Sequence, residues 1–122
     1  MHKAHILFVD DHADTRDMMT LLLTTADYNV VTAGTASEAL EVAQSKRFDV
    51  YILDVMLPDG LGVELCERLH ELRAGTPVLF YSAVAQEVEK RRTLERCGDM
   101  YLVKPATVPE LEEAITRLLD PK

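Results

Sequence analysis

The sequence predicts an α/β protein in which a parallel sheet of five strands is covered by helices on both faces. Strands are indicated by short runs of β-branched and other apolar residues, namely HILFV (5–9), NVVTA (29–33), DVYIL (49–53), PVLFYS (77–82) and MYLV (100–103). Helices are indicated between these runs by apolar residues spaced three and four positions apart. Strict alternation of strand and helix requires right-handed crossovers, and these place helices over both faces of a parallel sheet.

The predicted helices differ in how clearly their ends are marked. The segment at about 84–97 is the weakest, because EVEKRRTLER offers only Val88 and Leu94 as apolar contacts. We therefore expect a surface helix with a thin apolar stripe there. Two other helices begin with the spacing of a capping box, in which a hydroxyl and a carboxylate satisfy free N–H groups of the first turn: Thr35 with Glu38, and Thr107 with Glu110.

Length and charge limit the function classes. A chain of 122 residues, 48% of them hydrophobic, has the size of one domain, so we expect a single domain over 1–122. A net charge of -8 argues against general affinity for nucleic acid or an anionic membrane. The sequence has no apolar stretch of transmembrane length, and its N-terminal apolar run is too short for a signal peptide. We therefore expect a cytoplasmic protein.

The sequence contains two cysteines, Cys66 and Cys97. Both fall in predicted helices, they lack the spacing of a metal site, and no export signal points to an oxidising compartment. We expect buried, reduced thiols, with a disulfide between them as the alternative.

Polar side chains follow four of the predicted strands at the points where the strands end. Asp10 and Asp11 follow the first strand, Asp54 follows the third, Ser82 ends the fourth and Lys104 follows the fifth. A single aspartate after a strand is usually a cap or turn residue. This combination instead converges on the carboxyl edge of one sheet, where open α/β sheets bind their ligands.

The residue types at this edge suit phosphoryl transfer. Clustered carboxylates repel one another, and a hard divalent cation such as Mg²⁺ relieves that repulsion with oxygen ligands. A metal ion and a lysine also stabilise the charge on a transferring phosphoryl group. Asp54 is the natural nucleophile, and Ser82 and Lys104 are left to hold the phosphoryl oxygens. His12 is a weaker candidate ligand, because Mg²⁺ prefers oxygen, and we expect it at the rim of the site.

Four segments give the chain a family resemblance: VDD (9–11), ILDVMLPDGLG (52–62), YSA (81–83) and YLVKP (101–105). Through them the sequence resembles the receiver domains of bacterial response regulators in two-component signalling, a superfamily that includes chemotaxis regulators. The resemblance implies a flavodoxin-like (βα)5 three-layer sandwich with strand order 2-1-3-4-5.

The resemblance also assigns roles at the acidic edge. It makes Asp54 the phosphoacceptor. It makes the side chains of Asp10, Asp11 and Asp54, together with the backbone carbonyl of Met56, the ligands of Mg²⁺, with Mn²⁺ as an alternative ion.

Further roles follow for residues near the last two strands. The resemblance implies that Ser82 and Lys104 bind the phosphoryl group, and that the Lys104–Pro105 peptide bond is cis. Tyr101 matches an aromatic residue whose ring moves inward as Ser82 moves toward the phosphoryl group. Without the resemblance, Tyr101 would be a half-buried strand aromatic, and that alternative stays open.

Met56 and Val84 occupy positions that tune the lifetime of the phosphorylated state in similar proteins. Each lies two residues after a site residue, where polar side chains orient the hydrolytic water. Both are apolar here. We therefore expect a longer phosphoryl lifetime than that of fast chemotaxis-type receivers.

The resemblance implies a signalling switch rather than an enzyme, with at most self-phosphorylation and self-dephosphorylation. A sensor histidine kinase or a histidine phosphotransfer protein would donate the phosphoryl group. The surface formed by the helix at 84–97, the strand at 100–103 and the last helix would then act on an unknown output protein or domain. A phosphorylation-dependent homodimer is a further alternative, and no direct contact with nucleic acid or membrane is expected. The chain would act alone or as one module of a longer regulator or hybrid kinase.

Two other functions are weighed against this one. A Mg²⁺-dependent aspartyl-phosphate phosphatase of the haloacid-dehalogenase class usually carries a second aspartate two residues after the nucleophile, where this chain has Met56. A phosphorylation-independent binding module commonly lacks an acidic residue or the lysine, and this chain keeps them all.

Overall fold

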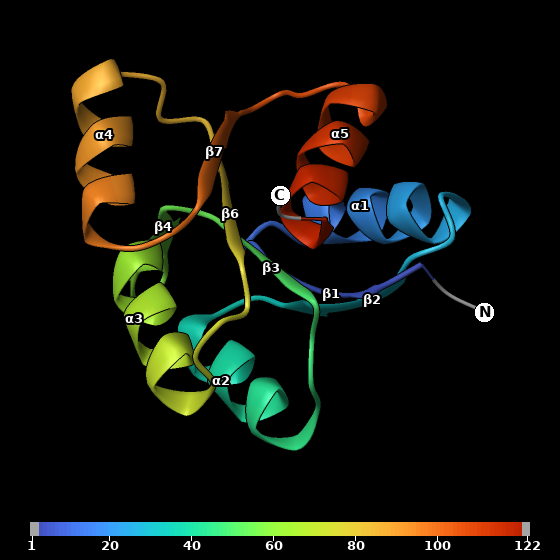
Figure 1. Cartoon of the computed structure of the whole chain (residues 1–122), viewed down its shortest axis with the longest axis horizontal. Coiled ribbons are helices and arrows are strands. Elements are labelled where there is room, and N and C mark those ends of the chain that lie inside the picture. Colours follow the sequence, from blue (N-terminus) through green and yellow to red (C-terminus); the bar gives the residue numbers. More distant parts are fainter. Residues whose placement is uncertain (1–2, 121–122) are drawn as a thin grey trace.

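The five predicted strands form one parallel sheet in the computed structural model, which describes residues 3–120 (Figure 1). The order across the sheet is β2-β1-β3-β6-β7, so the predicted order 2-1-3-4-5 is confirmed, with β6 and β7 as the fourth and fifth strands. The pairing is parallel throughout. The carboxyl ends of all five strands therefore meet at one edge. The strands are β1 (His5–Val9), β2 (Asn29–Ala33), β3 (Val50–Leu53), β6 (Val78–Ser82) and β7 (Met100–Val103).

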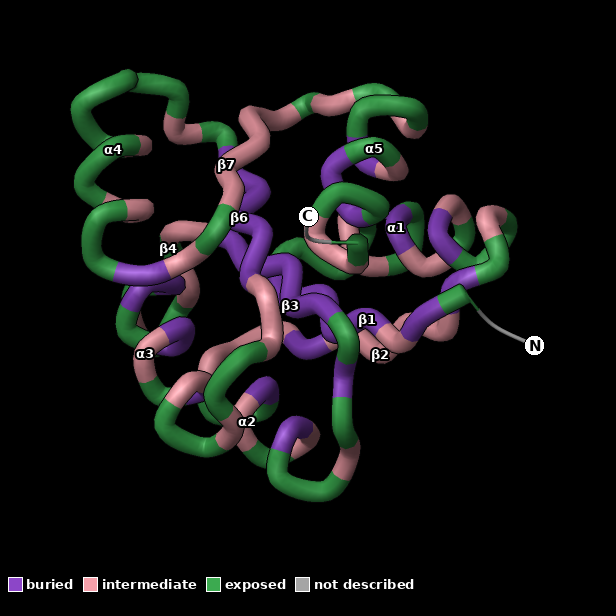
Figure 2. The backbone as a smooth tube through the Cα atoms, in the orientation of Figure 1, coloured by how far each residue is buried: buried purple, intermediate pink, exposed green. Residues whose placement is uncertain are grey.

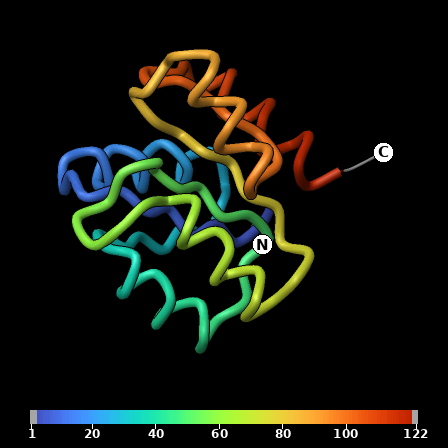
Figure 3. The backbone as a smooth tube through the Cα atoms, turned by 90° about the vertical axis from the view of Figure 1, so that its left-hand side faces the viewer, coloured from blue at the N-terminus to red at the C-terminus, as the bar shows by residue number. Residues whose placement is uncertain are grey.

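Helices cover both faces of the sheet and enclose two apolar cores (Figures 1 and 3). Side chains of α1 and α5 pack on one face, and side chains of α2 and α3 pack on the other. Alternate residues of the buried strands face the two cores, which explains why the strands read as continuous apolar runs. The helices are α1 (Ala13–Thr25), α2 (Ala36–Ser45), α3 (Gly62–Leu72), α4 (Glu87–Arg96) and α5 (Val108–Leu119). Within residues 3–120, no helix has the length and apolar character needed to span a bilayer.

The predicted capping box is confirmed in full at α5 but only in part at α2, where the Glu38 carboxylate accepts from the Gly34 N–H rather than from the Thr35 N–H. The Thr35 hydroxyl accepts a hydrogen bond from the Glu38 N–H at 3.0 Å at the start of α2. At the start of α5, the Thr107 hydroxyl accepts from the Glu110 N–H, and the Glu110 carboxylate accepts from the Thr107 N–H in return. These bonds satisfy N–H groups that have no partner within the first turn of a helix.

A short antiparallel hairpin, which the sequence did not predict, lies between β3 and α3. It consists of β4 (Met56–Leu57) and β5 (Gly60–Leu61). At its turn, Asp59 accepts hydrogen bonds from the N–H groups of Ala36 and Ser37, at 2.8 and 3.0 Å. The hairpin thereby caps α2 from outside that helix and fixes the loop that follows β3.

Helix α4 is attached to the sheet more loosely than the other helices. None of its residues is buried, and Figure 2 shows it as mostly exposed. Leu94 packs against the core, as expected, but the expected contact by Val88 is wrong because that side chain is 50% exposed. The helix also begins at Glu87, three residues later than predicted. The apolar contact between α4 and the core is therefore smaller than the sequence indicated, because Leu94 contributes to it and Val88 does not.

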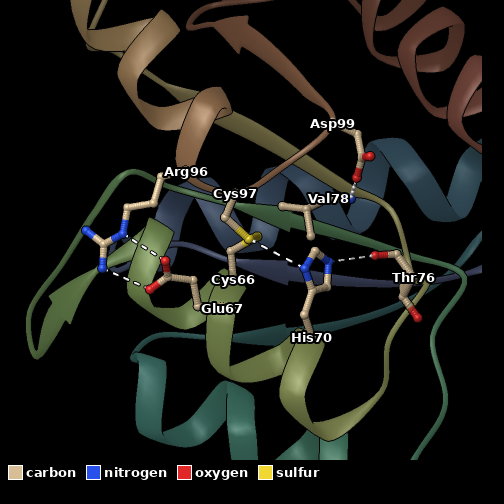
Figure 4. Close-up of a disulfide and its surroundings, with 8 residues drawn as sticks. All are labelled: Cys66, Glu67, His70, Thr76, Val78, Arg96, Cys97 and Asp99. Atoms are coloured by element: carbon tan, nitrogen blue, oxygen red, sulfur yellow. Dashed lines mark hydrogen bonds and ion pairs between the residues drawn. A yellow bond between two sulfur atoms is a disulfide. The ribbon is translucent and has the colours of Figure 1, made fainter.

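The expectation of reduced cysteines is wrong. Cys66 in α3 and Cys97 at the C-cap of α4 form a disulfide, with a Cα–Cα distance of 6.2 Å (Figure 4). Sequence spacing placed both residues in helices, but it carried no information on how those helices face each other. Cys97 actually lies one residue past the end of α4, where the chain turns toward β7 and Cys97 comes to face α3.

Candidate functional site at the carboxyl edge of the sheet

A lysine bridges two of the predicted site carboxylates. Asp10 directly follows β1, Asp54 directly follows β3, and both are buried, with 1% and 9% of their surface exposed. The Lys104 ammonium donates to Asp10 Oδ2 at 2.5 Å and to Asp54 Oδ2 at 3.0 Å. Asp10 and Lys104 are 94 residues apart in sequence, and Asp54 and Lys104 are 50 apart. They meet because β1, β3 and β7 all end at the same edge of the parallel sheet.

The bridge shifts the pKa values of its members. Burial by itself raises the pKa of Asp10, but hydrogen bonds from Lys104 and from the His12 N–H outweigh burial and hold that pKa below its ordinary value. Burial by itself lowers the pKa of Lys104, but its hydrogen bonds to Asp10 and Asp54 hold that pKa above its ordinary value. Both groups are therefore charged at neutral pH.

Asp11 and His12 lie at the outer rim of the same cluster. The Asp11 side chain is 37% exposed and the His12 side chain is 71% exposed. His12 Nδ1 is 3.2 Å from an oxygen of Asp10 and 3.2 Å from an oxygen of Asp11. The backbone N–H of His12 also donates to Asp10 at 2.9 Å. His12 thus sits at the rim, where the sequence placed it, and its backbone helps to orient Asp10.

The last two strands supply the hydroxyl groups of the site. Ser82 is 2% exposed, and its Oγ accepts a hydrogen bond from the Val84 N–H at 3.2 Å. The Tyr101 hydroxyl donates to the Val84 carbonyl at 2.7 Å, and burial raises the pKa of Tyr101. Tyr101 therefore reaches from β7 to the loop after β6, next to Ser82.

The backbone around Lys104 and Asp54 completes the geometry. The Lys104–Pro105 peptide bond is cis, the isomer that the resemblance implied. The Lys104 ammonium also lies 5.5 Å from the centre of the Tyr81 ring. Met56 is 64% exposed, and its N–H is 3.5 Å from Asp54 Oδ1. Met56 therefore stands beside Asp54 with its side chain toward solvent.

Two supporting residues were missed in the sequence. Arg16 on α1 donates to the Asp10 carbonyl at 2.8 Å and so holds the loop after β1. Gly62 packs against the loop after β3, where an added Cβ would lie 1.9 Å from the Asp54 carbonyl oxygen. The GLG segment at 60–62 hinted at close backbone approach, but Arg16 carries no signal apart from its position early in the first helix.

The donor set suits a hard divalent cation. Asp10, Asp11 and His12 each place a ligand atom within 4.8 Å of the others. Asp54 is close enough to Asp10 for one lysine nitrogen to contact both. Three carboxylates beside one ammonium leave excess negative charge, and carboxylate oxygens are the ligands that Mg²⁺ prefers.

Comparison with known proteins decides the family. The sequence profile described as "Response regulator receiver domain" matches residues 6–116. The chain belongs to this family.

Curated relatives of this receiver domain are named as regulators. This chain is 35% identical over 113 residues to the probable transcriptional regulatory protein TcrX of Mycobacterium tuberculosis. The match covers 93% of this chain and 47% of the relative. This chain is 33% identical over 114 residues to the alkaline phosphatase synthesis transcriptional regulatory protein PhoP of Bacillus subtilis, covering 93% and 48%. The chain thus spans about half the length of these relatives.

Solved structures show the same architecture. A CheY-like receiver domain protein from Methanospirillum hungatei matches with a TM-score of 0.88 at 33% identity, covering 95% of this chain and 93% of that one. Chemotaxis protein CheY4 of Vibrio cholerae matches with a TM-score of 0.88 at 33% identity, covering 95% and 98%. The flavodoxin-like fold is therefore established. Receiver domains of response regulators are generally regulatory rather than enzymatic.

Proposed function

We propose that this receiver domain accepts a phosphoryl group on Asp54 in a Mg²⁺-dependent reaction and thereby switches a partner or output domain. The observation that carries the proposal is the Lys104 ammonium bridging Asp10 and Asp54, with Ser82 at the end of the adjacent strand. This arrangement combines a nucleophilic carboxylate, a fixed positive charge and a hydroxyl donor at one sheet edge.

The proposed chemistry is a single displacement at phosphorus. An Asp54 oxygen forms the new O–P bond while the P–N bond of a phosphohistidine breaks, and the leaving imidazole takes up a proton. The side chains of Asp10, Asp11 and Asp54 and the Met56 carbonyl would hold Mg²⁺, which neutralises charge on the phosphoryl oxygens when bound.

Lys104 and Ser82 would convert the phosphoryl group into a change of shape. Lys104 would pair with a phosphoryl oxygen as a point charge, and Ser82 would donate a hydrogen bond to another. Because Val84 bonds to both Ser82 and Tyr101, a shift of Ser82 would also move the bond that holds Tyr101. We propose that this change reaches the surface formed by α4, β7 and α5. The phosphoryl group would act by stabilising one of two pre-existing conformations of that surface.

The proposed donor is a sensor histidine kinase or a histidine phosphotransfer protein in the cytoplasm. The output protein or domain is unknown, and a phosphorylation-dependent homodimer is one form that the output could take. Two relatives are named as transcriptional regulators, but this acidic receiver domain itself is not proposed to touch nucleic acid.

Incubation with Mg²⁺ and acetyl phosphate, followed by intact-protein mass spectrometry, tests the proposal. We expect one phosphoryl adduct that is absent from Asp54→Asn and strongly reduced by a chelator. Asp59→Asn is the matched control, because Asp59 lies in the same loop but its carboxylate faces α2, so this variant should still be phosphorylated. An adduct in Asp54→Asn, or none in wild type with either acetyl phosphate or a kinase donor, would refute the proposal. Turnover of simple phosphomonoesters would instead support the phosphatase alternative.

The lifetime of the adduct is a separate prediction. Met56 and Val84 flank the site and also line one groove between the hairpin and α4. Neither side chain can orient a water molecule for attack on the acyl phosphate. We expect Met56→Asn combined with Val84→Glu to speed loss of the adduct about tenfold or more, within the usual range for a positioned polar group. An unchanged decay rate, followed by mass spectrometry after removal of the donor, would contradict this reasoning.

A further inference from the structure

A second cluster of reactive side chains lies away from the phosphorylation site. It consists of the Cys66–Cys97 disulfide and the imidazole of His70, one turn along α3 from Cys66 (Figure 4). Cys97 lies shortly before the start of β7, whereas Lys104 follows the end of the same strand. Cys97 and Lys104 therefore lie toward opposite edges of the sheet.

The two nitrogens of His70 have different partners. Nε2 is 3.2 Å from the Thr76 carbonyl oxygen, and Nδ1 is 3.5 Å from Cys97 Sγ (Figure 4). A carbonyl only accepts hydrogen bonds, so Nε2 carries a proton, and in the tautomer protonated on Nε2 alone the Nδ1 lone pair faces the sulfur. A disulfide sulfur has no proton to donate, whereas a Cys97 thiol does. The position of His70 therefore fits a general base for Cys97 in the reduced protein.

The charged groups around this pair are already engaged elsewhere. Glu67 on α3 and Arg96 at the end of α4 form two hydrogen bonds with each other at 2.8 Å. The Asp99 carboxylate, before β7, accepts from the Val78 N–H at 2.8 Å. Within residues 3–120, His70 is thus the titratable group whose side chain contacts Cys97 Sγ.

The disulfide ties the C-terminal end of α4 covalently to α3, beside the packing of Leu94 against the core. Helix α4 buries none of its residues, and its neighbouring tie, the ion pair of Arg96 with Glu67, is about half exposed. Exposed ion pairs contribute little to stability. A groove of ≈ 420 Å³ separates α4 from the start of α3 and the hairpin. Helix α4 thus has space to move once its C-terminal end is released.

We propose that Cys66 and Cys97 form a reversible thiol–disulfide site, in which Cys97 is the attacking thiol, His70 is its base, and the bridge restrains α4. Cys97 is the more exposed of the two cysteine residues, at 9% where Cys66 is fully buried. Opening of the loosely held end of α4 would expose Cys97 first. This inference does not depend on phosphorylation of Asp54.

The co-reactant is a low-molecular-weight disulfide such as oxidised glutathione. His70 takes the proton of the Cys97 thiol, and the thiolate attacks one sulfur of the co-reactant and releases one thiolate. The Cys66 sulfur then attacks the Cys97 sulfur of the mixed disulfide, which forms the Cys66–Cys97 bond and releases the second thiolate. The two cysteine protons pass to the two released thiolates, and two electrons pass from the protein to the co-reactant. The reverse sequence reduces the protein.

Equilibration of the 122-residue chain with glutathione buffers of varied ratio tests reversibility. Free thiols are trapped with N-ethylmaleimide and counted by mass spectrometry. We expect both thiols to appear together as the buffer becomes more reducing, with the same ratio at half-oxidation approached from either direction. A disulfide that resists every glutathione ratio would overturn the proposal. So would reduced protein that retains one equivalent of zinc after dialysis and resists the alkylating agent until a chelator is added.

The role of His70 is tested in a Cys66→Ser background, where Cys97 is the single thiol. We expect His70→Gln to slow alkylation of Cys97 at neutral pH about tenfold and to move the rising limb of the pH–rate profile upward. Glu71→Gln, one residue along α3 and exposed, is the matched control and should leave both unchanged. Equal rates in the His70 and Glu71 variants over the whole pH range would refute the base assignment.

Restraint of α4 has its own readout. Hydrogen exchange of the peptide spanning 87–97 should quicken on reduction, while exchange in β1 and β3 stays constant. Cys66→Ser should show the fast rate whatever the redox buffer. Equal exchange of α4 in oxidised and reduced wild type would show that the bridge does not restrain the helix.

Discussion

Replacement of Lys104 by methionine tests how the charges of the proposed phosphorylation site stabilise one another. The Lys104 side chain is 19% exposed and contacts two carboxylates, of which Asp10 is almost fully buried. Methionine keeps much of the side-chain volume but removes the charge. Removing one partner of a buried ion pair costs about 3–5 kcal/mol, because the remaining charge stays buried without compensation. The partial exposure of Lys104 places the expected loss near the lower end, at about 3 kcal/mol.

The pH dependence of that loss follows from the two shifted pKa values. The pKa of Asp10 is lowered on folding, so its contribution to stability is present above the ordinary value of 3.8 and is lost as pH falls through the folded-state pKa. The pKa of Lys104 is raised, so its contribution is present below 10.5 and is lost as pH rises through the folded-state pKa. In Lys104→Met, burial of Asp10 is opposed by fewer hydrogen bonds, so acid destabilisation should begin at a higher pH. The loss of stability at alkaline pH that is due to deprotonation of Lys104 should be absent from this variant.

Urea unfolding followed by circular dichroism, from pH 3 to pH 11, measures these effects. At pH 7, a loss of about 3 kcal/mol corresponds to a fall in Tm of roughly 10 °C for a chain of this size. Mg²⁺ should restore part of the loss, because a bound cation can compensate Asp10 and Asp54 and stabilises the state that binds it.

Lys90→Met is the matched control for this experiment. Lys90 pairs with Glu87, whose side chain is 79% exposed, and it lies over the ring of Tyr101. Its loss should cost less than about 1 kcal/mol and should not respond to Mg²⁺. If the Lys104 and Lys90 variants lost equal stability, or if Mg²⁺ failed to stabilise Lys104→Met more than the control, the electrostatic reasoning would be wrong.

Two further predictions concern the loop after β3. Gly62→Ala places a Cβ against the Asp54 carbonyl oxygen and should cost more than about 3 kcal/mol in urea unfolding. Gly75→Ala, with a positive φ but open space, should cost only about 1 kcal/mol, and equal costs would contradict the steric argument. Asp59→Ala should lose about 1–2 kcal/mol at neutral pH, with Asp59→Asn losing less, because only the alanine variant removes the cap on α2. Hydrogen bonds from α2 lower the pKa of Asp59, so the stability that depends on the Asp59 charge should vanish as pH falls through that pKa. A difference in stability between wild type and Asp59→Asn that did not change with pH would refute this reasoning.

The sheet was predictable because its strands are buried on both faces. Such strands read as uninterrupted apolar runs, and the predicted ranges agree with the observed strands to within one residue. The order of the strands came from family resemblance, since alternation alone does not specify which strands are neighbours. Helix α4 was the least predictable element, because an exposed helix has little apolar periodicity, and Val88 gave a misleading signal.

The charged part of the site was predictable for a topological reason. Any residue directly after a strand of a parallel sheet must lie at the same edge, so Asp10, Asp54 and Lys104 could be placed together from spacing and strand assignment. Arg16 and Asp59 support that edge through hydrogen bonds to backbone groups, which leave no pattern in the sequence. The disulfide was missed for a related reason, because the contact between Cys66 and Cys97 depends on how α3 meets the end of α4.

Helix α3 links the two reactive clusters, and its attachments suggest which property each cluster controls. The helix begins at Gly62, where backbone contact with the Asp54 loop allows little movement. Cys66 lies four residues later, about 6 Å along the helix axis, and belongs to the buried core. Cys97, in contrast, ends a helix with no buried residue. When the bridge opens, α3 should therefore stay in place and α4 should move. We expect oxidation to alter what α4 presents to a partner and to leave the rate of phosphorylation at Asp54 nearly unchanged.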